Sequence, residues 1–187
     1  MTVSPGDPLL TLEPFLDAVR EGVEAAGWTL SGLQKTTSHQ FEGRWAGDST
    51  RSAYLFFHHP SRFEDAAVDV YLDETSRGLS GNLALVLDLL SLEDLPATSV
   101  LLSHLAAVAG DELPRGYGTP LTLRFRLPDP RGEVGSAETE VRFKVRIPRE
   151  ALEAGHDAVS ALSSTVVHTF QKLLLRPELQ RLMPPPE

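Results

Sequence analysis

The 187-residue sequence contains no cysteine, which excludes disulfide bonds, thiolate metal sites, iron–sulfur clusters and cysteine nucleophiles. It contains no apolar run near the roughly 20 residues of a membrane span, and residues 1–8 lack a signal-peptide pattern. We therefore expect a cytoplasmic protein with no membrane partner. Cations are also scarce: 17 Lys and Arg stand against 26 Asp and Glu, giving a net charge of −9. That charge argues against direct binding of nucleic acid.

The composition that remains is ordinary for one globular domain. Hydrophobic residues make up 41% and charged residues 23% of the chain, so it can form a core without disulfides or metals. Prolines and a glycine near the N-terminus predict a mobile tail over residues 1–8. We expect a single domain over residues 9–176, then a short helical turn and a proline-rich tail over residues 177–187.

Apolar periodicity in the first half predicts a helix followed by strands. After Thr11, apolar residues recur at helical spacing up to Gly27, which suits a helix end. Alternating apolar and polar residues predict a hairpin of Thr36–Thr50 and Arg51–His59, and a third strand over residues 66–73.

The segment Asn82–Leu92 fits two interpretations. Its leucines alternate as in a strand, but they also match one face of a helix. We interpret it as a strand, because Pro96 begins a separate helix with Val100, Leu101, Leu105 and Val108 inward and an end at Gly110.

The second half repeats the strand-then-helix pattern. Alternation over residues 121–127 and 141–147 predicts a second hairpin, which ends at Pro148. One long helix follows, until Pro177 interrupts it. Strands in runs rather than in alternation with helices indicate an α+β fold with an antiparallel sheet and helices packed on one face.

This order of elements resembles the YbjN-like family and the related type III secretion chaperones. The similarity covers most of residues 10–175, including Leu95-Pro96 before the central helix and Ile147–Leu152 between the last strand and the final helix. The resemblance implies a compact α+β protomer, usually dimeric, that binds other proteins. It implies no catalytic and no cofactor residues.

The residues themselves suggest no active site. His58 and His59 are adjacent on a predicted strand and therefore leave opposite faces, so they cannot chelate one ion together. His156 and His168 are out of phase on the last helix. The serines of that helix, such as Ser163, fit a close-packing side better than a nucleophile.

Acidic residues cluster on the third predicted strand. Asp69 and Asp73 share a face with Tyr71, without the glycine-containing loop pattern of a calcium site. We interpret this face as solvated, with weak cation binding as the alternative.

Positive charge is concentrated in the second hairpin. Residues 121–150 carry seven Arg or Lys and five Asp or Glu, whereas the rest of the chain is strongly acidic. One interpretation is a solvated face that prevents aggregation; the other is a docking face for an acidic partner segment or for a phosphate backbone. The cations expected on one face of this hairpin are Arg124, Arg126, Arg142, Lys144 and Arg146.

The final helix is apolar on more than one side. Beyond its main apolar stripe it carries Val167, Leu174 and Leu175. Such a helix is either central in the fold or part of an interface. We hypothesise that these three residues contribute to a homodimer interface, with central packing as the alternative.

The resemblance, taken together with these patterns, implies a non-enzymatic, chaperone-like or adaptor module that acts as a homodimer on a protein client. The acidic surface favours basic clients, a class that includes DNA-binding proteins. The alternative function is a regulatory domain that binds a small molecule or a cation. We expect no cofactor.

Overall fold

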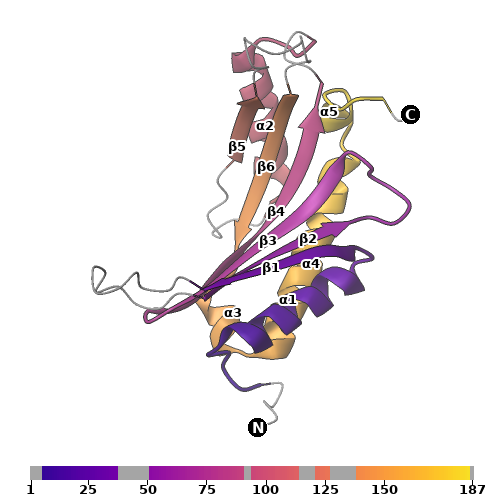
Figure 1. Cartoon of the computed structure of the whole chain (residues 1–187). Coiled ribbons are helices and arrows are strands. Elements are labelled where there is room, and N and C mark those ends of the chain that lie inside the picture. Colours follow the sequence, from indigo (N-terminus) through magenta and orange to yellow (C-terminus); the bar gives the residue numbers. More distant parts are fainter. Residues whose placement is uncertain (1–5, 38–50, 91–93, 114–120, 127–137, 186–187) are drawn as a thin grey trace.

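Figure 1 shows the computed structural model, which describes residues 6–37, 51–90, 94–113, 121–126 and 138–185. In these ranges six strands form one sheet and five helices accompany it. The elements are α1 (Leu12–Ala25), β1 (Thr29–Thr37), β2 (Arg51–His58), β3 (Ala66–Thr75), β4 (Gly78–Leu89), α2 (Thr98–Glu112), β5 (Leu121–Arg126), β6 (Glu138–Arg146), α3 (Arg149–Glu153), α4 (His156–Leu174) and α5 (Pro177–Gln180). The predicted α+β class is confirmed.

The sheet is antiparallel throughout, with strand order β1-β2-β3-β4-β6-β5. The first four strands follow one another in space as in sequence. Helix α2 then connects β4 to β5, and β6 returns between β4 and β5. The central strands β3 and β4 bury every second residue against the helices, as the alternation predicted. The interpretation of the leucine-rich segment 82–92 as a strand is therefore confirmed over the residues of β4.

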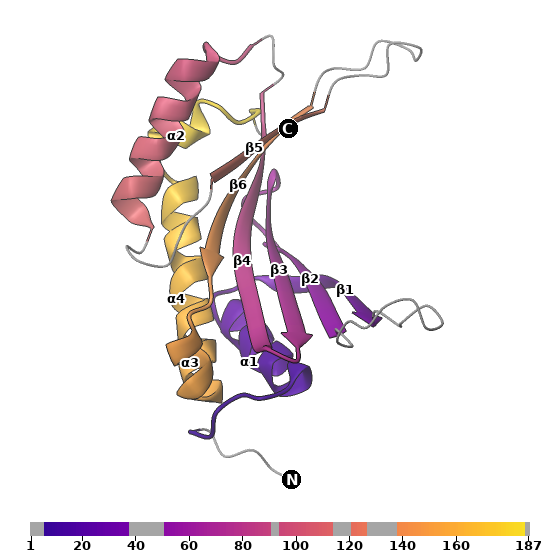
Figure 2. The ribbon, with the colours of Figure 1, turned by 90° about the vertical axis from the view of Figure 1, so that its left-hand side faces the viewer.

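Helices cover one face of the sheet. Figure 2 shows α2 and α4 along the same side of it. Helix α4 is central, because it contacts α1, α2, α3, α5 and β4. It packs most closely on α1 at Gly22, where an added Cβ would lie 2.2 Å from the Ser160 backbone oxygen and 2.8 Å from the Ser163 Cβ. Ser163 is fully buried there, as its predicted close-packing role requires.

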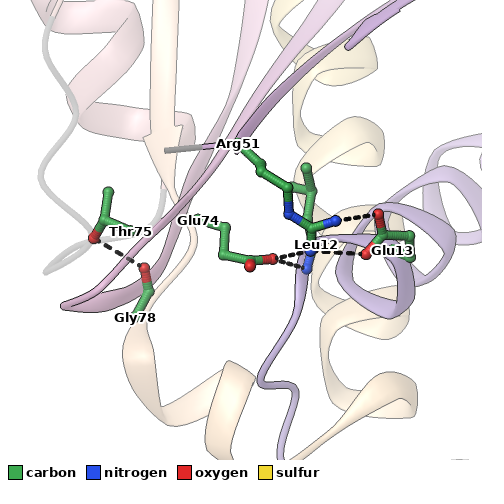
Figure 3. A network of polar contacts seen from close by, with 6 residues as sticks. All are labelled: Leu12, Glu13, Arg51, Glu74, Thr75 and Gly78. Carbon is green, nitrogen blue, oxygen red and sulfur yellow. Dashed lines mark hydrogen bonds and ion pairs between the residues drawn. The ribbon is translucent and has the colours of Figure 1, made fainter. Parts of the chain in front are cut away.

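The start of α1 is held by the sheet rather than by its own cap residue. Thr11 occupies the N-cap position but its side chain makes no capping hydrogen bond. The Leu12 N–H instead donates to the Glu74 carboxylate on β3 (Figure 3). The Arg51 guanidinium links the same carboxylate to α1. It donates one hydrogen bond of 2.7 Å to Glu74 and two, of 2.7 and 3.1 Å, to Glu13 on α1. Opposite charges and the helix N–H groups thus fix the start of α1 at one end of strands β2 and β3.

The first hairpin differs from the prediction. Its first strand is Thr29–Thr37 rather than Thr36–Thr50, and residues 38–50 lie outside the described residues. The alternation of apolar and polar residues did not predict β1, because β1 is an edge strand with mostly exposed positions. Its register with β2 also shifts between Leu30 and Gly32. The second strand, β2, lies where it was predicted.

The predicted long final helix is divided in two. Gly155 between α3 and α4 has a φ of 94°, a backbone conformation that favours glycine and that no helix contains. The apolar stripe continues across this break, with Leu152 and Val159 both buried. Periodicity alone therefore could not locate it.

Helix α2 and the C-terminal segment also differ from the prediction in detail. Leu101, Leu105 and Val108 are buried as predicted, but Val100 is 44% exposed because it lies on another side of α2. Beyond α5, Leu182 is buried and its carbonyl accepts the Leu90 N–H at 2.7 Å. The chain after Pro177 therefore belongs to the core as far as Leu182.

Candidate functional site: the open face of the sheet

The face of the sheet that points away from α1 and α4 is uncovered by any helix of the described chain, and we call it the open face. The strand registers bring side chains from five neighbouring strands together on it. Its members are Ser52, Tyr54, Phe56, Asp69, Tyr71, Asp73, Ser80, Asn82, Ala84, Val86, Thr122, Arg124, Glu140, Arg142, Lys144 and Arg146. The predicted placement of the hairpin cations on one face is confirmed for Arg124, Arg142, Lys144 and Arg146. The side chain of Arg126 lies outside the described residues.

A hollow of about 270 Å³ lies in the middle of this face. Tyr54 and Tyr71 form one side, with ring centroids 4.7 Å apart, and Tyr54 is 38% exposed. Arg142 and Lys144 lie on the opposite side, across β4. The remaining lining residues are Phe56, Asp69, Val70, Asn82 and Ala84. We call this the sheet hollow.

Arg142 belongs to the scaffold of the sheet hollow rather than to its free surface. It reaches over β4 to Asp69 on β3, at 3.3 Å, and binds Glu140 on its own strand at 2.7 Å. The three side chains are only 20–26% exposed. Burial raises the pKa of Asp69 above its usual value, and the Arg142 charge partly offsets this. The interpretation of Asp69 as a solvated carboxylate is therefore wrong.

The other cations of the open face remain available for a ligand. Lys144 lines the sheet hollow, and Arg146 and Arg124 are exposed. Within the described part of the chain, none of the three forms an ion pair. Asp73, by contrast, accepts a hydrogen bond from the Ser52 hydroxyl at 2.8 Å.

Two aromatic residues of the open face, Tyr54 and Phe56, were missed in the sequence. Tyr54 and Phe56 alternate with the buried Ala53, Leu55 and Phe57 on β2, so their outward orientation was predictable. Their position beside the cations was not, because it depends on the strand order β2-β3-β4-β6. The second hairpin supplies the charge, and the first supplies the aromatic surface.

The proposed dimer residues need correction. Val167 is fully buried and Leu174 is 2% exposed within one protomer, because α4 packs against β4 and against the four other helices. The hypothesis that these two residues form a dimer interface is wrong. Leu175 is 51% exposed, so it remains accessible.

Exposed apolar surface is instead found on α2. Val100 and Leu102 are 44% and 43% exposed, and Ala106 and Ala107 are exposed beside them. Residues 98–110 contain no Asp, Glu, Lys or Arg. The exposed side of α2 is thus a surface with little charge on a strongly acidic protein.

The described residues contain no group of three or more His, Asp or Glu placed to hold a metal ion. No helix among them has the length and apolarity needed to cross a bilayer. Comparisons of the chain with protein-family models, with curated proteins and with solved structures found no match.

Proposed function

We propose that this protein is a non-enzymatic, chaperone-like or adaptor module that binds an extended segment of a client protein on the open face of its sheet. One observation carries the proposal: at the sheet hollow Lys144, which forms no ion pair within the described residues, lies across from the Tyr54 and Tyr71 rings, and Tyr54 is exposed. Aromatic side chains and arginine are typical of the centres of protein interfaces.

The chemistry of the open face defines the segment it fits. An apolar or aromatic side chain of the client enters the sheet hollow against Tyr54 and Tyr71. Carboxylates on the same segment then bind Lys144 and Arg146, since charge-assisted hydrogen bonds to carboxylates are among the strong ones. The contacting segment is therefore acidic and apolar. The net charge of −9 favours clients that are basic elsewhere, among them DNA-binding proteins.

Two further features support a binding module that acts as a homodimer. The element order resembles that of YbjN-like proteins and type III secretion chaperones, for which a dimeric, protein-binding function is expected. The exposed side of α2 suits a second copy of this chain. Two protomers that each carry a net charge of −9 repel each other least when they meet through a surface without charged side chains.

A small-molecule-binding regulatory domain is the second candidate. It is favoured by a hollow of about 510 Å³ between residues 61–65 and the C-terminal segment. Its lining combines apolar and charged side chains, as ligand sites do. The apolar residues are Phe63, Leu174, Met183, Pro184 and Pro185, and the charged ones are Arg62, Glu64 and Asp65.

Peptide selection tests the leading proposal. Peptides selected from a random displayed library on the wild-type protein should be rich in acidic and apolar residues. Their affinity should then be measured by fluorescence polarisation with Lys144→Gln/Arg146→Gln. We expect it to fall at least about tenfold, because each lost charge-assisted contact removes about 1.5–3 kcal/mol.

The matched control is Lys172→Gln/Arg181→Gln, which removes the same charge from exposed positions outside the open face. This variant should bind the selected peptides as the wild type does. Equal affinities for both double variants, or selected peptides without acidic residues, contradict the proposal.

A further inference from the structure

A second hollow lies at the end of the sheet where α3 begins, and three arginines line it. We propose that it binds a small anionic amphiphile, with a carboxylate or phosphate head on a short aliphatic chain. Its volume is about 340 Å³, at the lower end of the range of about 300–1,000 Å³ for small-molecule sites. We call it the arginine hollow. Figure 1 shows α3 and the start of α1 at this end of the sheet.

Four separate segments build the walls of the arginine hollow. They are residues 8–10, residues 77–80 at the β3–β4 turn, residues 146–147 at the end of β6, and α3. Hydrogen bonds fix each wall to its neighbour. The Leu9 N–H donates to the Leu152 carbonyl at 2.8 Å, and the Ile147 N–H donates to the Gly81 carbonyl at 2.9 Å.

The β3–β4 turn is held in the same way. The Thr75 hydroxyl donates to the Gly78 carbonyl at 3.3 Å (Figure 3), and the Arg77 N–H donates to the Thr75 hydroxyl oxygen at 3.1 Å. The backbone that carries Arg77 is therefore ordered before a ligand arrives. A site whose walls are already in place loses less conformational entropy on binding.

The charge of the arginine hollow selects an anion. Arg77 and Arg146 are exposed and, within the described residues, form no ion pair. Arg149 binds Glu153 at 2.8 Å, but the two side chains are 87% and 58% exposed, so this pair is weak. Two positive charges therefore remain in excess. Guanidinium groups bind carboxylates and phosphates through paired hydrogen bonds.

The apolar lining explains why a bare anion is not the best ligand. Leu9, Leu10, Leu79, Ile147 and Leu152 line the hollow together with the arginines. Leu10 is 77% exposed, the most exposed of the large hydrophobic residues described. Leu9, Ile147 and Leu152 are already buried and form the floor. An aliphatic chain against Leu10 and Leu79 would remove apolar surface from water on both partners.

The arginine hollow shares no lining residue with the sheet hollow, although Arg146 and Ser80 lie on the open face and also line the arginine hollow. The proposal therefore does not depend on the function proposed above. Lys144, the residue that tests peptide binding, does not line the arginine hollow.

Isothermal titration calorimetry of the full chain tests the proposal with four probes: octanoate, octyl phosphate, octanol and inorganic phosphate. We expect octanoate or octyl phosphate to bind at least tenfold more tightly than octanol and than inorganic phosphate. The better of the two anions identifies the head group. If neither binds, or if octanol binds as well as both, the proposal is overturned.

Variants locate the binding. Arg77→Gln/Arg149→Gln should lower the affinity for the tighter-binding anionic amphiphile at least tenfold. Leu10→Ser should also lower that affinity, with little effect on the affinity for inorganic phosphate. The matched control is Arg20→Gln/Arg181→Gln, which removes two exposed arginines outside this hollow and should leave the affinity unchanged. Equal weakening by both double variants would show non-specific attraction and overturn the site. Because both hollow variants retain Lys144 and Arg146, their binding of selected peptides reports separately on the open face.

Discussion

Asp69, Arg142 and Glu140 form the most consequential side-chain cluster of the open face. Arg142 crosses β4 to reach Asp69, so its aliphatic stem covers part of the central strands. That position accounts for the burial of Ala84 and Val86 on a face without helices. Arg142 therefore stabilises the sheet, while its neighbours Lys144 and Arg146 remain free for a ligand.

Substituting Arg142 should accordingly cost stability. Arg142→Gln leaves Asp69 and Glu140 half-buried without their cation, and we expect a loss of about 1–3 kcal/mol in the free energy of unfolding. Arg146→Gln changes an exposed side chain and should stay within about 0.5 kcal/mol of the wild type. Urea unfolding measures both. Equal stability of the two variants would show that Arg142 is only a surface charge.

The pH dependence of stability should report Asp69 separately. Because its pKa is raised on folding, the folded state holds this proton more tightly than the unfolded state does. The contribution of Asp69 to stability is thus largest at low pH and falls as the pH rises past about 3.9, the ordinary pKa of an aspartate. The melting temperature of the wild type minus that of Asp69→Asn should therefore decrease between pH 3 and pH 7.

Asn82→Ala serves as the control for this series, because it changes the same face without removing a titrating group. Its difference from the wild type should be independent of pH. A difference for Asp69→Asn that stays constant or grows with pH would contradict a raised pKa.

Among the elements, the contact between α1 and α4 has the least room for change. Gly22→Ala places a methyl group against the Ser160 backbone oxygen, which cannot move without shifting α4. We expect a loss of about 3 kcal/mol, the upper part of the usual range for overpacking. The matched control is Gly110→Ala on α2, where an added Cβ meets nothing within 4 Å.

Gly110→Ala should instead stabilise the protein by about 0.5–1 kcal/mol, since alanine has a higher helix propensity than glycine. Thermal and urea unfolding of the two variants measure the contrast. A similar effect of both substitutions would mean that helix propensity, rather than the close contact, decides the outcome at Gly22.

The same elements show what the sequence could predict. The strand β3 was identified because every second residue is apolar. For β4, where Leu83–Leu87 are all apolar, periodicity left a helix open, and the separate helix expected from Pro96 decided for a strand. The edge strand β1 was not identified, because its positions are mostly exposed. The break at Gly155 was also missed, because the apolar stripe continues across it.

The candidate site was predictable only in part, for a related reason. Alternation within β6 placed Arg142, Lys144 and Arg146 on one face. That Arg142 is bound by Asp69, and that Tyr54 and Tyr71 lie opposite, follows from pairing between strands far apart in sequence. Periodicity within one strand contains no information on such pairing.

At the scale of the whole molecule, assembly is the first property to test. If α2 forms the interface of a homodimer, Leu102→Glu/Ala106→Glu should give a folded monomer by light scattering, because both side chains are exposed in the protomer. Val167→Glu or Leu174→Glu should instead unfold the protein, since each places a carboxylate in the core. A wild type that is monomeric at tens of micromolar would rule out the dimer.

Nucleic-acid binding is the second property of the whole molecule. The open face combines aromatic rings with cations, as single-strand binders do, but the chain carries a net charge of −9. We expect the net charge to dominate, with no salt-sensitive binding to DNA or RNA tighter than about 10⁻⁵ M near physiological salt. Submicromolar binding to a single strand that weakens steeply with added salt would reverse this expectation.

The packing of α1 on α4 also has a consequence for synthesis of the chain. Gln171 on α4 donates a hydrogen bond to the Ala26 carbonyl at 2.9 Å, although the two residues are 145 positions apart. Ribosomes add about 5–20 residues per second, so α1 waits on the order of ten seconds before its packing partner has been made. During that interval α1 can pack on β1, β2 and β3, which it also contacts, but the side that faces α4 has no native partner. Chaperones that bind exposed apolar segments should therefore associate with the nascent chain until α4 has left the ribosome, and release it once the two helices meet.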